Sequence, residues 1–239
     1  MSLQKQKLLV LAAAVLFTAG SILGAVVSLN RSLMKPEGSD DAILILPIGL
    51  KGVEASAPDE SQLEALSLSL LESLDLRIVI GQKIELPAML IDRQTGQMRA
   101  DLALGEIAQR ARKTRYLRII GITAKDIAIP KYNYLFGLAQ KGGRACIVST
   151  ARFGTPGTAQ AQKRLDKVAL HELGHTFGLM HSTDRQSIMV YSDSLDILDS
   201  AAWLFTEADR KAIQKLVPSL AGKLLVPPVT AASATGMGG

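Results

Sequence analysis

The chain has 239 residues, enough for one sizeable domain with extensions, and 48% of them are hydrophobic, a high share for a soluble enzyme. The formal net charge is +5 and aromatic residues are few; this mild excess favours acidic surfaces or anionic lipid and does not by itself indicate nucleic acid. The single cysteine, Cys146, excludes an intrachain disulfide, and its apolar neighbours indicate a small buried side chain.

The first part of the chain is a candidate membrane segment. Residues 8–29 are uncharged and mostly apolar, and a helix of that length would span roughly 33 Å, enough to cross a bilayer. We expect an uncleaved transmembrane anchor within residues 1–30, with a cleaved signal peptide and a buried soluble helix as alternatives. Lys5 and Lys7 favour a membrane-anchored domain on the outer face, or a secreted one, although basic residues behind the span weaken that orientation. Residues 31–41 form a polar linker.

The globular part is predicted to occupy residues 42–220, and the glycine-rich tail, 221–239, is expected to be disordered. The predicted strands are residues 42–46, 76–80 with 83–86, 116–122, 132–139 and 145–149. The predicted helices are residues 58–74, 100–113, 160–179 and 207–216. We expect Pro47 to end the first strand, and Gly142-Gly143 to form a turn that makes the last two strands antiparallel.

The second predicted helix ends in a basic cluster. It consists of Arg110, Arg112, Lys113, Arg115 and Arg118. Cations at this end complement the helix dipole, so we interpret the cluster as solvated, with a nucleic-acid or lipid contact as the alternative. No nucleic-acid partner is expected overall.

One short stretch carries the strongest chemical signal, because the chain's three histidines all lie in it with the spacing HExxHxxGxxH. In a helix His171 and His175 share one face, and a turn at Gly178 would bring His181 to the same point. Three protein ligands with an open fourth position predict a catalytic zinc site. Glu172 is then the general base that takes a proton from the zinc-bound water. The alternative is two core histidines with a third nearby by chance.

Two residues after the histidines bear on this site. Met189 is expected to pack beneath the imidazoles, with ordinary core filling as the alternative. Tyr191 lies either near the metal or in the core or rim. Further on, Thr206 is predicted to cap the last helix, with Asp209 at its third position.

The chain resembles the archaemetzincins over residues 43–216. The resemblance rests on the zinc motif and on residues 132–139, 145–152, 164–167 and 187–189. It implies an α/β metzincin-like fold: a twisted mixed sheet of about five strands, mostly parallel with one antiparallel edge, packed on the helix that carries His171 and His175. It also implies a zinc peptidase, without deciding between endopeptidase and aminopeptidase. The edge strand, residues 132–139, would pair with an extended peptide.

The chain departs from the archaemetzincin pattern at a second metal site. Four cysteines of the family bind a structural zinc there, and the matching positions here hold Ser182, Ser187, Thr206 and Asp209. Without thiolates that site cannot form, so we predict one zinc ion only. We expect hydrophobic packing to hold this segment together instead, through Ile197, Leu198, Trp203, Leu204 and Phe205.

The favoured function is therefore a zinc-dependent metallopeptidase acting on a peptide or protein substrate. Two alternatives stay open: a non-catalytic zinc- or peptide-binding module tethered to a membrane, and a zinc amidase acting on cell-wall peptides. An intact Glu172 argues against the first, and analysis of the products would separate the second.

Overall fold

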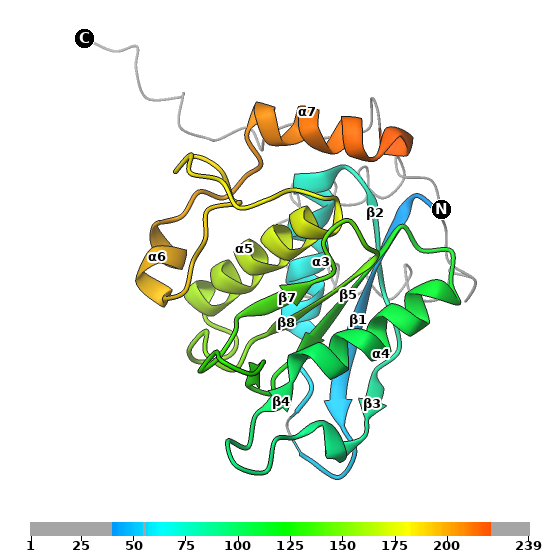
Figure 1. Cartoon of the computed structure of the whole chain (residues 1–239), viewed down its shortest axis with the longest axis vertical. Helices are drawn as coiled ribbons and strands as arrows, with labels where there is room; N and C mark the ends of the chain where they lie inside the picture. Colours follow the sequence, from blue (N-terminus) through cyan, green and yellow to red (C-terminus); the bar gives the residue numbers. More distant parts are fainter. Residues whose placement is uncertain (1–39, 55, 221–239) are drawn as a thin grey trace, which may run out of the picture.

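A mostly parallel sheet forms the centre of the fold (Figure 1). The computed structural model describes residues 40–54 and 56–220. Its six-stranded sheet has the order β2-β1-β5-β8-β7. The sixth strand, β3, pairs with β1 on the same side as β2. The strands are β1 (Ala42–Leu50), β2 (Arg77–Ile80), β3 (Ile84–Leu86), β5 (Arg118–Thr123), β7 (Gly137–Ala139) and β8 (Ala145–Ser149), and a separate pair is β4 (Met98–Arg99) with β6 (Ile127–Ala128). Only β7 runs antiparallel in the large sheet, as predicted, and the strand number is six rather than about five.

The helices begin and end close to the predicted positions. They are α3 (Glu60–Leu74), α4 (Ala100–Arg112), α5 (Ala159–Thr176), α6 (Leu195–Ser200) and α7 (Glu207–Leu216), with short 3₁₀ turns η1 (Ala88–Leu90) and η2 (Pro218–Leu220). Asp59 caps α3 and Thr206 caps α7, each with a side-chain oxygen that accepts from a backbone N–H of the first turn. The short helix α6 was not predicted, because its six residues are too few to show a helical period.

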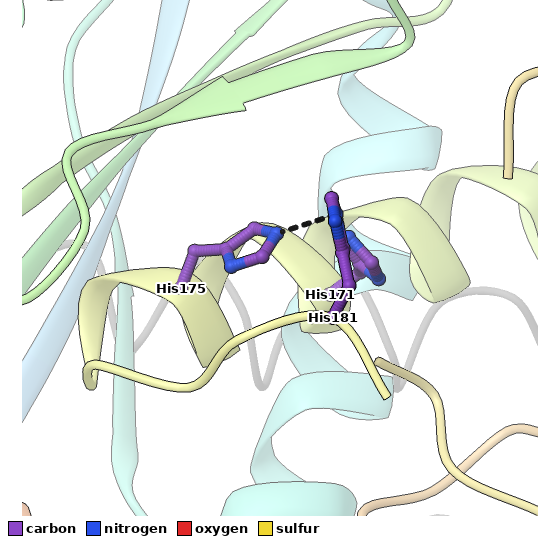
Figure 2. A group of neighbouring side chains, drawn as sticks. All are labelled: His171, His175 and His181. Atoms are coloured by element: carbon purple, nitrogen blue, oxygen red, sulfur yellow. Dashed lines mark hydrogen bonds between the residues drawn. The ribbon is translucent and has the colours of Figure 1, made fainter. Parts of the chain in front are cut away.

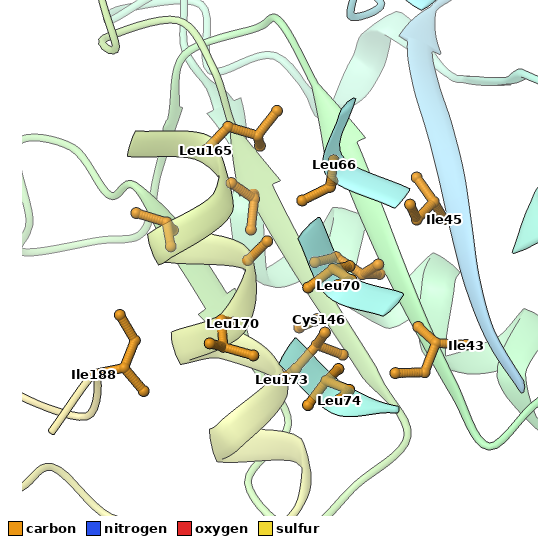
Figure 3. Packing of buried hydrophobic residues seen from close by; sticks show 14 of the residues in the cluster. Ile43, Ile45, Leu66, Leu70, Leu74, Cys146, Leu165, Leu170, Leu173 and Ile188 are labelled. Carbon is orange, nitrogen blue, oxygen red and sulfur yellow. The ribbon is translucent and has the colours of Figure 1, made fainter. Parts of the chain in front are cut away.

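Helices cover both faces of the sheet, and the alternation of β1 decides which residues face which helix. Ile43 and Ile45 pack in one cluster with α3 and α5, which Figure 3 shows in close-up. Leu44 and Leu46 pack in a second cluster with α4 on the other face. Successive strand residues point to opposite faces, so a continuous apolar run such as that of β1 supplies both layers. The helix that carries the histidines, α5, is therefore held against a buried sheet.

The prediction that Pro47 ends the first strand is wrong, since β1 continues to Leu50. On one side, β1 pairs with β2 up to Ile45 and with β3 only from Ile48. Pro47 lies between these two partners. The carbonyl of Ile45 accepts from Gly81 N on this side, so position 47 also directs its nitrogen here. The missing N–H of proline therefore falls in a gap where no strand would accept it.

The predicted edge strand, residues 132–139, is shorter than expected, since only β7 is extended and paired with β8. The preceding residues leave the sheet. Leu135 N donates instead to the carbonyl of Ile127, and Tyr134 Oη donates to the carbonyl of Asp193. Tertiary contacts thus replace strand pairing over the first part of this apolar segment.

The predicted membrane segment and the predicted disordered tail both lie outside the described residues, so both stay predictions. Among the residues that the structure describes, no helix is both long and apolar enough to cross a bilayer.

A buried acid on α5 predicts a pH dependence of stability. Asp166 accepts a hydrogen bond from Gln162 Nε2 at 2.7 Å, and burial raises the pKa of its carboxyl to about 7. A raised pKa means that this group's contribution to stability is complete below about pH 4 and is lost as the pH rises through 7. Asp166→Asn should therefore raise the free energy of unfolding by roughly 2–4 kcal/mol at pH 8 and hardly at all at pH 4. Urea denaturation of both proteins at the two pH values measures this, and an equal difference at both would contradict it.

Candidate metal centre

The helix α5 places two of the three histidines. Thr158 caps its first turn by accepting from Ala161 N, and the helix ends at Thr176, three residues before the predicted end. His171 and His175 lie one turn apart on the side of the helix that lines a cleft, and both are partly buried. Gly178 has a φ of +103°, a conformation that residues with a Cβ rarely adopt, and the chain reverses there. The glycine of the motif thus forms the turn that leads to His181, as the sequence predicts.

The three imidazoles converge (Figure 2). One nitrogen from each lies within 4.8 Å of the other two, and the Nε2 atoms of His175 and His181 are 3.2 Å apart. Tetrahedral coordination at about 2.1 Å puts ligand nitrogens about 3.4 Å apart, so the nitrogens of His175 and His181 are spaced as zinc ligands are. The structure therefore brings together all three residues that the sequence singled out.

Hydrogen bonds fix the tautomers of two histidines. His171 Nδ1 lies 2.8 Å from the carbonyl oxygen of Ile188, and His175 Nδ1 lies 2.9 Å from that of Leu179. A carbonyl can only accept, so each Nδ1 must carry the proton and each Nε2 keeps its lone pair for a metal. Burial lowers the pKa of His171 to about 4, which also favours the neutral imidazole. Both the geometry and the protonation of these donors suit zinc.

Glu172 lies beside the triad and is buried, with 7% of its surface exposed. Burial raises the pKa of its carboxyl to about 8. The edge strand β7 passes directly over it. A Cβ added to Gly137 would lie 2.6 Å from both Cγ and Oε1 of Glu172. Only a residue without a side chain allows this approach, and nothing in the spacing of Gly137 indicated it, because the contact joins positions far apart in the sequence.

Met189 and Tyr191 both pack next to the histidine motif. Met189 is fully buried, and a Cβ added to Gly174 on α5 would lie 2.4 Å from its Sδ. The methionine thus packs beneath the helix turn that carries the histidines, as predicted. Tyr191 is half exposed and stands edge-on to His181, with ring centroids 5.1 Å apart. Its ring therefore lies at the rim of the site, next to an imidazole.

A cleft of about 660 Å³ opens above the histidines. One wall is formed by residues 131–139, which include β7, and the other by the residues around Tyr191 and the end of α6. Because β7 is the last strand of the sheet, one of its sides is unpaired within the described fold. The cleft thus runs past an unpaired strand edge, the kind of site to which extended peptides add a strand.

Two buried cations hold α5 to its surroundings, and the sequence did not identify either role. Arg118, interpreted above as solvated, is buried: its Nε donates to Thr176 Oγ1 at 3.1 Å and its Nη2 to the Thr176 carbonyl. Burial lowers its pKa to about 10. It therefore stabilises the last turn of α5, where helix carbonyls lack partners.

Lys167, one turn before His171, is the second buried cation. Its Nζ donates to the carbonyls of Leu198, Asp199 and Ala201 at 2.8, 2.9 and 2.6 Å. These carbonyls belong to the end of α6, so the lysine joins the histidine helix to one wall of the cleft. The position of Lys167 in the predicted helix did not indicate this contact with α6.

Three of the four positions that the sequence resemblance assigns to a second metal site meet in the structure. Ser187, Thr206 and Asp209 are joined by hydrogen bonds, and Ser182 N donates to the carbonyl of Met189. The expected hydrophobic packing is present only in part: Leu198 and Phe205 are buried, whereas Ile197 and Trp203 are partly exposed. Both polar and apolar contacts therefore stabilise this segment.

Comparison with known protein families supports the interpretation of this site as a metal centre. Residues 68–215 match the profile of Peptidase family M54, well over half of the chain. The chain belongs to this family. Membership of family M54, with the histidine triad, identifies a zinc-dependent metallopeptidase.

The relatives of this M54 chain are archaemetzincins. The one from Methanopyrus kandleri is 34% identical over 134 residues, which are 56% of this chain and 75% of the relative. Its crystal structure superposes with a TM-score of 0.63 at 27% identity, covering 78% of this chain and 99% of that one. An archaemetzincin from Archaeoglobus fulgidus, solved with malonate, shares the fold with a TM-score of 0.60 at 23% identity, covering 72% and 99%. The predicted resemblance is therefore confirmed.

Proposed function

We propose that this protein hydrolyses peptide bonds at one zinc ion held by His171, His175 and His181, with Glu172 as the general base. The observation that carries the proposal is the convergence of three imidazoles beside a buried carboxylate in an open cleft. Zinc bound there would polarise the scissile carbonyl and make a water molecule more acidic. Glu172 would accept a proton on a carboxylate oxygen and pass it to the leaving amine.

Other parts of the cleft would orient the substrate and the base. An extended peptide would pair with the free edge of β7, so that its scissile bond lies opposite the histidines. The approach of Gly137 to Glu172 would hold the base beneath this strand. Tyr191, next to His181, would donate a hydrogen bond to the oxyanion that develops on the carbonyl.

The direct test is incubation of the purified protein with a mixed peptide library, followed by mass spectrometry, with and without a zinc chelator. We expect cleavage products that disappear with the chelator and return when zinc is added. The positions of the cuts separate endopeptidase from aminopeptidase action, and cleavage of cell-wall peptides alone would favour the amidase. No cleavage of any peptide would refute the proposal and favour the non-catalytic module.

Zinc stoichiometry is a separate prediction. The side chains of Ser187 and Thr206 donate hydrogen bonds to Asp209, and none of these three positions holds a cysteine. We therefore expect one zinc per chain, since a structural zinc site needs stronger donors than hydroxyls. Elemental analysis of dialysed protein measures this ratio, and two tightly held ions would contradict it.

A further inference from the structure

A hydrogen-bonded cluster links the start of α7 to the turn below the histidines. Its three members, Ser187, Thr206 and Asp209, are named here the Asp209 cluster. Asp209 Oδ2 accepts from Ser187 Oγ at 2.6 Å, from Thr206 Oγ1 at 2.8 Å and from Thr206 N at 2.9 Å. Ser187 is fully buried. Three donors on one carboxylate oxygen, one of them buried, make this a strongly held junction.

The cluster continues into the turn of residues 187–189. Ser187 Oγ accepts from Met189 N at 2.9 Å, so the serine hydroxyl both donates to the carboxylate and holds the backbone of the turn. Within this turn the carbonyl of Ile188 lies 2.8 Å from His171 Nδ1. The carbonyl of Met189 accepts from Ser182 N, the residue directly after His181. One carbonyl of this turn thus orients the ring of His171, and another holds the backbone directly after His181.

We propose that Asp209, acting through Ser187, is a positioning residue of the metal centre. The inference rests on the proposed role of the histidines as zinc ligands. The carboxylate fixes the Ser187 hydroxyl, the hydroxyl fixes the turn, and the turn sets the ring of His171 and the start of the segment after His181. Outer partners of metal-binding histidines fix both tautomer and orientation, and losing one typically weakens metal binding about 10–100-fold.

Helix capping is the alternative role for the cluster. Thr206 and Asp209 form a capping box at α7, which would stabilise that helix whether or not the turn is held. Ser187→Ala separates the two roles, because it leaves the box intact and removes only the link to the turn. A matched control is Glu207→Gln in the same first turn, an exposed residue whose carboxylate pairs with Lys211 and not with the cluster.

The test is zinc affinity, measured by competition with a chromogenic chelator, together with the visible spectrum of the cobalt-substituted protein. We expect Ser187→Ala to bind zinc about 10–100-fold more weakly than wild type and to alter the cobalt spectrum, while Glu207→Gln matches wild type. Equal affinities and spectra for the two variants would overturn the positioning role. A wild-type protein that binds no zinc would instead refute the proposed function.

A second variant covers the case in which Ser187→Ala does not fold. Asp209→Asn keeps an oxygen that can accept the same hydrogen bonds and cap α7, but it removes their charge assistance. We expect Asp209→Asn to bind zinc more weakly than wild type, with an unchanged helix content by circular dichroism. Zinc affinity equal to that of Glu207→Gln would overturn the inference.

Discussion

Replacing Glu172 by Gln is expected to lower kcat for peptide hydrolysis about 10²–10⁴-fold while zinc affinity stays at the wild-type value. The amide has nearly the shape of the carboxylate, so its packing against Gly137 should persist. The amide cannot accept a proton, however. Position 172 is not among the three residues whose nitrogens converge, so the substitution leaves the metal ligands in place. The expected signature is therefore loss of turnover without loss of metal, measured by steady-state kinetics and chelator competition on the same samples.

A matched control for this variant lies on the same helix. Asp166→Asn makes the same change of acid to amide at a buried position of α5, but its side chain contacts Gln162 and not the cleft. It should retain wild-type kcat. If Glu172→Gln also retained wild-type kcat, the residue would not be the base. If it lost zinc together with activity, its role would be to support the metal centre.

Local geometry explains why much of this site was predictable. The spacing of His171 and His175 fixes their common face as soon as the segment is helical, and Gly178 allows the reversal that follows. The predicted cap at Thr206 is local in the same way, because its side chain bonds within the first turn of its own helix. Features that depend on a few consecutive residues therefore agreed with the structure.

The features that were missed depend on contacts between distant segments. Pro47 is tolerated in β1 because β2 ends and β3 begins beside it, which no local pattern encodes. Arg118 looked solvated at the end of a basic run, yet the following strand carries it beneath Thr176. The link from Asp209 to Ser187 joins a helix cap to a turn, and each half has an adequate local explanation by itself. Tertiary packing, rather than composition, decides all three.

Gly137→Ala is expected to lower kcat about 10²-fold with little change in zinc affinity. Its Cβ would lie 2.6 Å from Cγ and Oε1 of Glu172 and 2.8 Å from Cδ, closer than atoms can approach. The glutamate side chain can rotate away, so the protein should fold, but a base displaced by about 1 Å loses its alignment with the water and the scissile bond. Steady-state kinetics and chelator competition measure the two quantities.

The matched control is Gly105→Ala on the exposed side of α4. A Cβ there meets no atom within 4 Å, so alanine should stabilise the helix by roughly 0.5–1 kcal/mol and leave kcat unchanged. Wild-type activity in Gly137→Ala would mean that the glycine has no part in placing the base.

A double variant separates two ways in which Gly137→Ala could reduce turnover. If the methyl group acts by displacing Glu172, adding it to Glu172→Gln should cause little further loss, since the carboxylate through which it acts is already gone. If it acts instead by blocking the pairing of a peptide with β7, the loss should persist in the double variant and fall mainly on KM. The contact between Gly137 and Glu172 favours the first outcome, because the added atom would point at the base and not along the free edge of the strand. Full additivity of the two substitutions in kcat would contradict it.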